Sequence, residues 1–239
     1  MAEIENKEAI HEACREGRLA AVESLLAANP KLAYRKDSDD RLPIHWACSY
    51  SHKAIVQLLQ QTKDFDVDVQ DGSGWTPLMI ACSIKDGDEL IDLLLARGAD
   101  VNLKNFNGQT PLHFCASKNN ISIARKLLSP PYKASSRLPD KQQQLPIHRA
   151  AAVGSTPMVK LLLDNLSPLN SQDRSGLTPL HHAVAEGHGD VAVELLRRGA
   201  ESGRLDKEGN LALKLAPDQK VAKWILTEAE KEGIEVVVS

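Results

Sequence analysis

Eight histidines and four cysteines are the residues of this 239-residue chain best suited to chemistry. An imidazole acts as a general base or a metal ligand, and a thiolate acts as a nucleophile or a metal ligand. Four of the histidines recur at one position of a repeated block, namely His45, His113, His148 and His181. Their recurrence indicates a structural role, in which each imidazole forms hydrogen bonds between loops.

The other histidines give no stronger sign of catalysis. His52 and His188 fall where a turn between two helices is expected. His181 and His182 are adjacent, and neighbouring residues of a helix point about 100° apart, so they cannot easily share a metal. The sequence contains no H-E-x-x-H, C-x-x-C or G-x-S-x-G motif and no glycine-rich phosphate loop. We therefore predict a protein that is not an enzyme, with no metal and no cofactor.

The cysteines mark a period. They are Cys14, Cys48, Cys82 and Cys115, at intervals of 34, 34 and 33 residues. Neighbouring helices pack about 8–10 Å apart, beyond the roughly 7 Å between Cα atoms that a disulfide spans. We expect the four thiols to be small buried side chains in a reducing compartment.

The same period runs through a proline-containing block. Its prolines stand at 43, 77, 111, 146 and 179, in steps of 34, 34, 35 and 33 residues. The copies read LPIHWA, TPLMIA, TPLHFC, LPIHRA and TPLHHA, and degenerate copies at 9–13 and 212–216 flank them. A T-P-L-H-x-A block at a period of about 33 residues is typical of the ankyrin repeat.

We predict an all-α ankyrin-repeat solenoid of about seven helix-turn-helix repeats with short β-hairpin fingers. Threonine before proline suits a helix start, and a Val/Ile-x-x-Leu-Leu stripe marks each second helix. The chain is expected to form one domain, 1–239, with approximate repeats 1–37, 38–71, 72–105, 106–140, 141–173, 174–206 and 207–239. We expect a looser finger over 129–144. The end of the chain, 228–239, either frays or covers the last repeat through the valines at 236–238.

Residues that the repeat does not fix are the candidate binding residues. The x position of the block holds Trp46, Ile80, Phe114, Arg149 and His182, and the residue before the block is Arg41, Trp75, Gln109, Gln144 or Leu177. Lys118 and Glu186 lie one turn further along their helices. We expect an exposed apolar stripe on the concave face, edged by Arg41, Lys118 and Arg149, because Trp and Arg are common interface anchors. Alternatively, each aromatic ring packs on its neighbouring finger. Trp224 is expected in the core or in the cap.

The two halves of the chain differ in net charge. Residues 1–120 hold 18 acidic and 13 basic residues, net −5, and residues 121–239 hold 14 and 16, net +2. A partner of opposite polarity would be steered into one orientation. The total of −3 argues against nucleic acid, and the absence of long apolar stretches argues against a membrane. The charged first residues lack a signal-peptide core, so we expect a protein of the cytoplasm and nucleus.

Several segments together resemble the gankyrin family. They are DDRLPIHWACS at 39–49, the residues at 71–77, ASKN at 116–119 and HRAAA at 148–152, while AEGHGD at 185–190 is similar to the fungal counterpart. Members of this family are assembly chaperones of the 26S proteasome regulatory particle. Their concave face binds the C-terminal helical domain of a base ATPase subunit and hinders docking of the base onto the core particle.

The resemblance implies specific contacts and one departure. Arg41, Trp46, Trp75, Lys118 and Arg149 would contact the ATPase domain, with Asp39 and Asp71 as acidic companions. The L-x-C-x-E motif for retinoblastoma-protein binding is absent, and the matching segment 180–184 reads LHHAV. That activity is therefore not expected here. We expect a monomer when the protein is free.

Two alternatives remain open. One is an ankyrin adaptor for another client, such as a kinase or a transcription regulator, because a fold does not fix a function. The other is an enzyme with its site in a groove of the stack, which would require a turnover that depends on His182 and Glu186.

Overall fold

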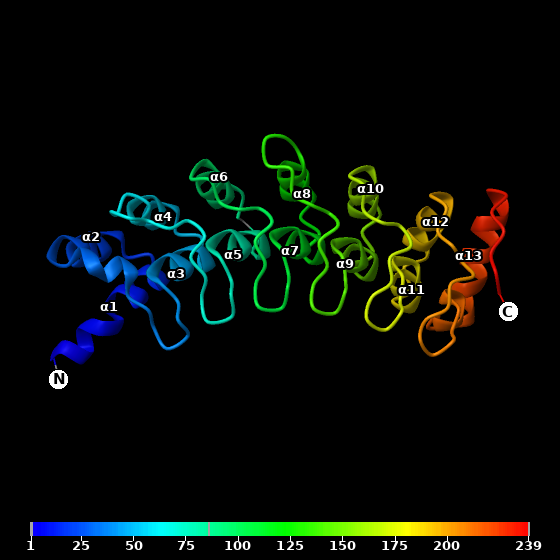
Figure 1. Cartoon of the computed structure of the whole chain (residues 1–239), viewed down its shortest axis with the longest axis horizontal. Helices are drawn as coiled ribbons and strands as arrows, with labels where there is room; N and C mark the ends of the chain where they lie inside the picture. The colour runs from blue at the N-terminus through cyan, green and yellow to red at the C-terminus, as the bar shows by residue number, and fades with distance from the viewer. Residues whose placement is uncertain (1, 86, 239) are drawn as a thin grey trace. The chain divides into compact units, whose positions relative to one another are not determined.

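A computed structural model describes the backbone of residues 2–85 and 87–238. The chain divides into two compact units, residues 1–111 and 112–239. The described residues form thirteen α-helices and two 3-10 helices. Figure 1 shows that the helices of each unit come in pairs, with a projecting loop after each pair. The single domain expected from the repeat stays a prediction.

The first unit contains three helix pairs and a 3-10 helix. They are α1 Ala2–Glu16, α2 Leu19–Ala28, η1 Pro30–Tyr34, α3 Pro43–Ser49, α4 Lys53–Leu59, α5 Pro77–Ser83 and α6 Asp88–Ala96. The second unit follows with α7 Pro111–Ser117, α8 Ile121–Leu128, α9 Pro146–Val153, α10 Thr156–Asp164, α11 Pro179–Ala185, α12 Gly189–Arg197, η2 Ala212–Leu215 and α13 Gln219–Lys231. The predicted helical repeat is confirmed.

Each first helix of the internal repeats begins at the block proline, and the residue before it is the cap. Thr76 and Thr178 accept the N–H of the residue three positions later through their hydroxyls. Leucine stands at the same place in two repeats and has no such oxygen. There the block histidine compensates, because His45 Nδ1 accepts the Leu42 N–H at 3.0 Å and His148 Nδ1 accepts the Leu145 N–H at 2.9 Å. The histidine thus satisfies a backbone donor that the helix start leaves without a partner.

The other ring nitrogen of these histidines reaches the next loop. Because Nδ1 accepts, the proton lies on Nε2, which donates from His45 to the carbonyls of Val69 and Trp75, both at 3.2 Å. His113 donates likewise to Gln144 at 3.0 Å and His181 to Asn210 at 3.3 Å. The predicted hydrogen bonding between loops is confirmed.

Burial keeps the imidazoles of His45, His148 and His181 neutral. It lowers the pKa of His45 and of His181. Burial, followed by the charge of the neighbouring His182, lowers the pKa of His148 to about 4. Each ring can therefore accept at Nδ1 and donate at Nε2 throughout the neutral range.

The core consists mainly of Leu, Ile, Val and Ala side chains, together with Met79, Met158, Phe114 and the four cysteines. Cys14, Cys48, Cys82 and Cys115 are buried thiols outside any disulfide, and their predicted burial is confirmed. Burial raises the pKa of the Cys14 thiol to about 12. The thiol therefore stays protonated at neutral pH and contributes apolar packing rather than nucleophilic chemistry.

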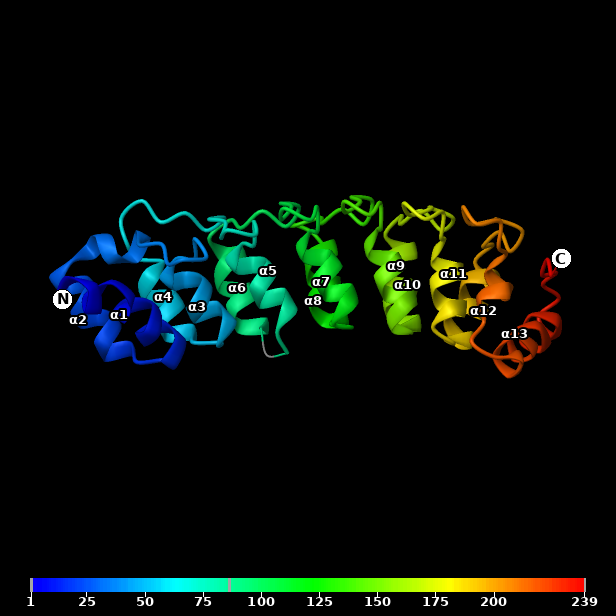
Figure 2. The ribbon, with the colours of Figure 1, turned by 90° about the horizontal axis from the view of Figure 1, so that it is seen from below.

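The fingers are closed turns rather than the expected β-hairpins. In the finger that starts at Asp71, its Oδ1 accepts the N–H groups of Ser73 and Trp75, both at 2.9 Å, and its own N–H donates to the Trp75 carbonyl at 3.0 Å. The aspartate carboxylate thereby satisfies backbone N–H groups that a β-ladder would otherwise pair with carbonyls. Among the described residues the sole β-bridge joins Leu205 and Leu211. Figure 2 shows the loops of each unit along one edge of its helices.

The expected irregularity at 129–144 is confined to its first part. The tip at 140–144 is regular, because Asp140 Oδ1 accepts the N–H groups of Gln142 and Gln144 at 2.8 and 2.9 Å. The unusual part is 129–139, which stands where the third repeat has Gly98-Ala99-Asp100 and the sixth has Gly199-Ala200.

The C-terminal tail and Trp224 both pack on the preceding repeat. The Val237 N–H donates to Ser202 Oγ at 3.0 Å, and the valine side chain lies on Gly203, so the tail covers the preceding turn. Trp224 packs its ring on Gly189 at the start of α12 and is 45% exposed. Its place in the core was a wrong expectation, while its place in the cap is confirmed.

Candidate protein-binding surface

Three of the candidate anchors are held by an aspartate nine residues earlier in the chain. Trp46 donates its indole Nε1–H to Asp37 Oδ2 at 2.7 Å. Arg149 donates through Nη2 to Asp140 Oδ2 at 2.8 Å, and His182 Nε2 lies 3.0 Å from Asp173 Oδ2. The other oxygen of each aspartate closes its own finger. A single carboxylate thus fixes both the finger and the anchor.

Residues just before the block link consecutive fingers within each unit. Arg41 Nε donates to Asp71 Oδ2 at 3.1 Å, and Gln144 Nε2 donates to Asp173 Oδ2 at 3.0 Å. Asp71 has this oxygen available because the residue nine positions later, Ile80, has no donor. Arg41 therefore binds Asp71 Oδ2, the oxygen that binds the anchor side chain in the other repeats.

Trp46 is held from three directions in the first unit. Its indole N–H is bound by Asp37, the Arg41 guanidinium lies 5.2 Å from the ring centroid, and Tyr50 stacks on it with centroids 6.4 Å apart. A cation over an indole face is attracted by the negative π-cloud. Both side chains therefore have a fixed orientation before any partner arrives, which lowers the entropy cost of binding.

Arg149 and His182 are the matching pair in the second unit. The Arg149 side chain is 32% exposed while its Asp140 partner is only 3% exposed, and its Nε is buried without a hydrogen bond. His182 meets His148 edge to face, with ring centroids 5.5 Å apart. The charge of the guanidinium is therefore presented at the surface on a buried carboxylate support.

Two of the supporting aspartates, Asp37 and Asp173, have lowered pKa values. Burial works to raise the pKa of Asp37, but hydrogen bonds from the Trp46 indole and from the backbone of Arg41 and Asp39 outweigh it and lower the pKa below its ordinary value. Burial also works to raise the pKa of Asp173, but hydrogen bonds from Gln144 and His182 outweigh it, so the pKa of Asp173 is lowered. Each carboxylate accepts donors on both oxygens, which favours its charged form.

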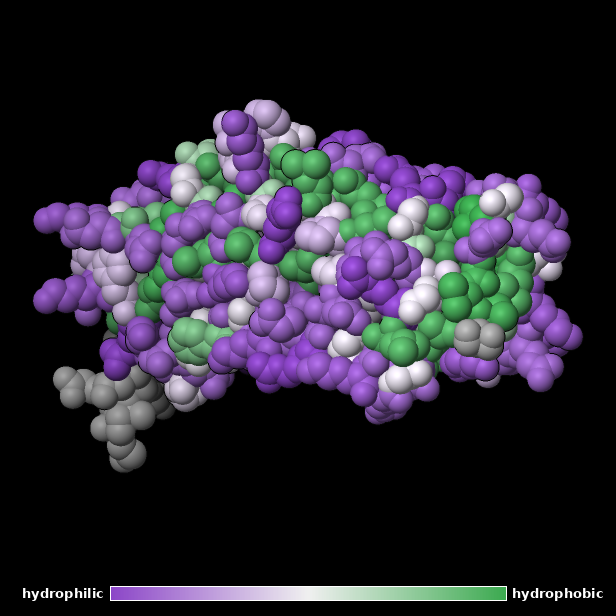
Figure 3. Space-filling view, turned by 45° about the vertical axis from the view of Figure 1, so that its right-hand side comes forward, coloured by the Kyte–Doolittle hydropathy of each residue, from purple (hydrophilic) through white to green (hydrophobic). Residues whose placement is uncertain are grey.

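The predicted exposed apolar stripe is wrong for two of its members. Ile80 is 4% exposed and Phe114 is 8% exposed, because both side chains turn into the packing of their units. Trp46 and Trp75 are half-buried. The candidate surface is therefore aromatic and charged rather than apolar. On the face drawn in Figure 3, hydrophobic patches are separated by hydrophilic side chains.

The remaining candidates are exposed. Asp39 stands at a finger tip, and its carbonyl accepts the Gly72 N–H of the next finger at 2.8 Å. Lys118 follows α7, and Glu186 follows α11. The imidazole of His182 is engaged by Asp173, so the geometry does not favour the His182–Glu186 pair required by the enzyme alternative.

Sequence reasoning missed the supporting aspartates. The repeat pattern assigns no supporting role to Asp37, Asp140 or Asp173. The signal was present as a spacing, because an acid stands nine residues before each x residue that can donate a hydrogen bond. Tyr50, which stacks on Trp46 and is 52% exposed, also gave no repeat-based signal.

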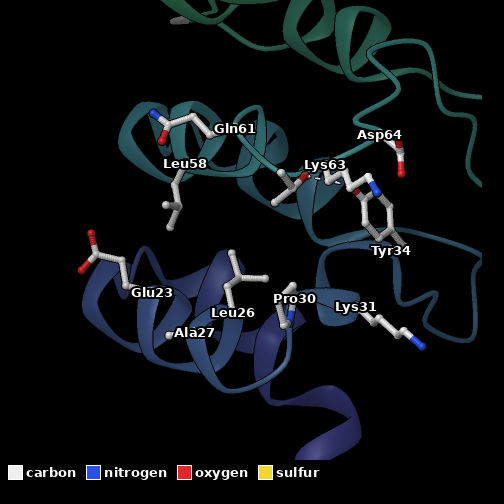
Figure 4. Close-up of a pocket in the computed structure, with 11 residues that line it drawn as sticks. Glu23, Leu26, Ala27, Pro30, Lys31, Tyr34, Leu58, Gln61, Lys63 and Asp64 are labelled. Carbon is white, nitrogen blue, oxygen red and sulfur yellow. Dashed lines mark hydrogen bonds between the residues drawn. The ribbon is translucent and has the colours of Figure 1, made fainter.

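An open groove of about 560 Å³ lies elsewhere in the first unit, between α2, η1 and α4 (Figure 4). Leu26, Ala27, Pro30 and Leu58 form its apolar part. Its two hydroxyl groups are already engaged, since Tyr34 donates to Thr62 Oγ1 at 3.0 Å and Thr62 donates to the Leu59 carbonyl at 2.7 Å. The groove therefore offers shape and apolar surface but no activated nucleophile.

Across residues 2–85 and 87–238, no three His, Cys, Asp or Glu side chains are grouped as a metal would require. No helix in this part of the chain combines the length and apolar character needed to cross a bilayer.

Comparisons with known proteins agree with this architecture. The family profile described as "Ankyrin repeats (3 copies)" matches residues 2–71, 57–140, 83–173 and 147–238. The crystal structure of the ankyrin repeat domain of Bcl-3 is similar with a TM-score of 0.73 and 25% identity, over 92% of this chain and 97% of that one.

Two fungal proteins are similar over nearly the full length. The "Probable 26S proteasome regulatory subunit p28" of Saccharomyces cerevisiae is 39% identical over 91% of this chain and 96% of that protein. "Ankyrin repeat-containing protein C6C3.08" of Schizosaccharomyces pombe is 39% identical over 95% and 97%. The human "26S proteasome non-ATPase regulatory subunit 10" is 40% identical over 60 residues, 25% of this chain and 26% of that protein. With repeats along nearly its whole length and these relatives, the chain belongs to the ankyrin-repeat proteins and, among them, to the gankyrin family.

Proposed function

We propose that this protein is a non-catalytic scaffold that chaperones assembly of the 26S proteasome regulatory particle. In this proposal Trp46 and Trp75 of the first unit and Arg149 of the second unit contact the C-terminal helical domain of a base ATPase subunit. Its action is steric, because a bound chaperone occupies the ATPase domain and blocks another partner. We place this activity in the cytoplasm and nucleus, with the free protein a monomer.

The observation that carries the proposal is the support of the anchors by aspartates, of which Asp140 is buried and Asp37 is half-buried. Trp46 and Arg149 each present a half-buried interface-type side chain that a carboxylate already holds in one orientation. Such residues in fixed rotamers are typical of interface hot spots, because little conformational entropy remains to be lost. The printed name of the yeast p28 relative supports the proteasome as the setting.

The charge distribution supports an orientation of the partner. The first half of the chain is acidic, at net −5, and the second half is net +2. An ATPase domain with basic side chains facing Asp39 and acidic side chains facing Arg149 would bind in one direction. Reversal of either charge would then weaken binding more than its removal.

The test is a pull-down from native extract with the wild-type protein and the Trp75→Ala/Arg149→Glu double variant, followed by mass identification of the bound proteins. Trp224→Ala/Arg204→Glu is the matched control, because it changes the same residue types at exposed positions outside the candidate surface. We expect base ATPase subunits with the wild type and the control but not with the double variant. Recovery by all three would move the interface elsewhere. Their absence from all three would instead favour an adaptor for another client.

A further inference from the structure

The fourth repeat has an unusual charge composition. No acidic residue occurs from 101 through 139, although the chain as a whole is net −3. Within the second unit this stretch contributes five cations, Lys118, Arg125, Lys126, Lys133 and Arg137. Lys118 belongs to the candidate surface of the proposed function, and the others surround the end of α8. A local positive field in an acidic protein therefore centres on this helix and the loop that follows it.

The loop at 129–139 is fixed against the second unit. Its start continues α8, because Ser129 Oγ donates to the Arg125 carbonyl at 2.8 Å and the Lys133 N–H donates to the Ser129 carbonyl at 3.2 Å. The Ala134 N–H returns to the Leu127 carbonyl at 2.8 Å. The loop thus folds back on its own helix instead of extending as a free linker.

A second attachment joins the loop to the end of α10. Ser136, which is 2% exposed, donates through Oγ to the Asn165 carbonyl at 2.7 Å. Ala134 is also buried. Because these two residues point inward, Lys133 and Arg137 on either side of them are exposed. In Figure 1 the loop rises beyond α8 and away from the finger tip of its own repeat.

Three of the cations lack an opposite charge. Arg125, Lys133 and Arg137 are exposed, and none makes an ion pair within the described part of the chain. Lys126 is half-buried and already has an interaction, so it is not included. The neighbouring carboxylate on α10, Asp164, is paired with Arg198 at 2.9 Å. Favourable interaction with the C-terminal end of α8 accounts for Arg125 but not for Lys133 and Arg137, which lie outside the helix.

We propose that Arg125, Lys133 and Arg137 form a basic ridge that binds an acidic segment of a protein. Arg125 on α8 and Lys133 and Arg137 on the fixed loop match a short run of carboxylates, and the exposed Pro130 and Pro131 add rigid apolar contact. A nucleic acid is disfavoured, because such sites usually neutralise many phosphates and stack bases on aromatic rings. None of the three ridge residues is an anchor of the candidate surface. The ridge would therefore be a second binding site, in addition to the one in the proposed function.

The test is fluorescence anisotropy with a labelled peptide of alternating glutamate and serine. Binding is compared for the wild type, for Arg125→Glu/Lys133→Glu/Arg137→Glu, and for Lys207→Glu/Lys214→Glu/Lys220→Glu. The last variant has the same net charge change at three exposed lysines of the second unit. A fourth protein, Lys118→Glu/Arg149→Glu, tests the anchor face. Circular dichroism establishes that each variant is folded.

We expect the ridge variant to bind about tenfold more weakly than the wild type, since it loses three exposed ion pairs, while the other two variants keep most of the affinity. Equal losses in the ridge variant and the lysine control would reduce the effect to net charge and overturn the proposal. Loss only in Lys118→Glu/Arg149→Glu, or no binding by the wild type, would also overturn it. Tighter ridge-dependent binding of a labelled single-stranded DNA would reassign the ridge to nucleic acid. Because the ridge variant leaves the anchors intact, its recovery of ATPase subunits separates this test from that of the proposed function.

Discussion

The carboxylate of Asp37 and the indole of Trp46 are joined by a 2.7 Å hydrogen bond across nine residues of chain. The same aspartate closes its finger through the N–H groups of Asp39 and Arg41, both at 2.9 Å. The relationship recurs between Asp140 and Arg149 and between Asp173 and His182. In each of these repeats one aspartate therefore couples the conformation of the finger to the orientation of the anchor.

Asp37→Ala should release Trp46 and open its finger. Asp206→Ala is the matched control, because Asp206 closes its finger in the same way through Glu208 and Asn210, while Leu215 nine residues later has no donor. We expect both variants to lose stability, but only Asp37→Ala to weaken partner binding, by about tenfold. Equal binding by the two variants would show that the aspartate serves the finger alone. The measurements are chemical unfolding and titration calorimetry.

Trp46→Ala and Trp75→Ala should each cost on the order of 2 kcal/mol of partner binding, the usual scale of an anchor residue. Trp224→Ala removes a ring that is 45% exposed outside the candidate surface and should leave affinity unchanged. Titration calorimetry with the partner domain gives the three values, and intrinsic fluorescence monitors the fold. Unchanged affinity in a folded Trp46→Ala protein would count against this residue as an anchor.

Arg149→Glu should weaken binding more than Arg149→Ala, because it places a second carboxylate beside Asp140 and opposes an acidic partner surface. The same two substitutions at Arg204, whose partner is the exposed Glu201, provide the comparison. The difference between Glu and Ala should be large at position 149 and small at 204. If Glu and Ala had the same effect at 149, the charge match would be refuted. Surface plasmon resonance at two salt concentrations gives both effects.

The free energy of unfolding should fall as the pH drops below about 6.5. Burial lowers the pKa of His148 from 6.5 to about 4, so the unfolded chain binds a proton in this interval that the folded chain does not. The stabilisation is thus complete above 6.5 and lost toward 4, by roughly 3 kcal/mol for this residue. The lowered pKa values of His45 and His181 act in the same direction.

His148→Gln isolates that contribution. A glutamine at this helix position can still accept the Leu145 N–H but does not titrate near neutrality. Denaturant unfolding at several pH values should therefore give a shallower slope for the variant between 6.5 and 4. An unchanged slope would place the acid sensitivity in other groups.

Helix positions and caps could be predicted from the sequence, because they depend on local chemistry. The block proline sets the first turn of each helix, and the apolar stripe of each second helix requires one buried face. The roles of His45 and His148 also followed from their recurrence. These features repeat, and each copy supports the interpretation of the others.

The burial of individual x residues could not be predicted in this way. Ile80 and Phe114 occupy the same repeat position as Trp46 and Arg149, yet Ile80 and Phe114 are buried while Trp46 and Arg149 are half-buried. The supporting aspartates were missed for a related reason. The turn alone accounts for an aspartate at this position. The hydrogen bond of its second oxygen depends on the folded position of a side chain nine residues later, which the sequence does not show.

The most direct test of the central claim is titration calorimetry of the isolated C-terminal domain of a base ATPase subunit into the wild-type protein and into Trp75→Ala/Arg149→Glu. The account predicts one-to-one binding by the wild type and a loss of at least about a hundredfold in affinity for the folded double variant. Equal affinity of the two proteins would contradict the account, because the anchors would then lie outside the interface.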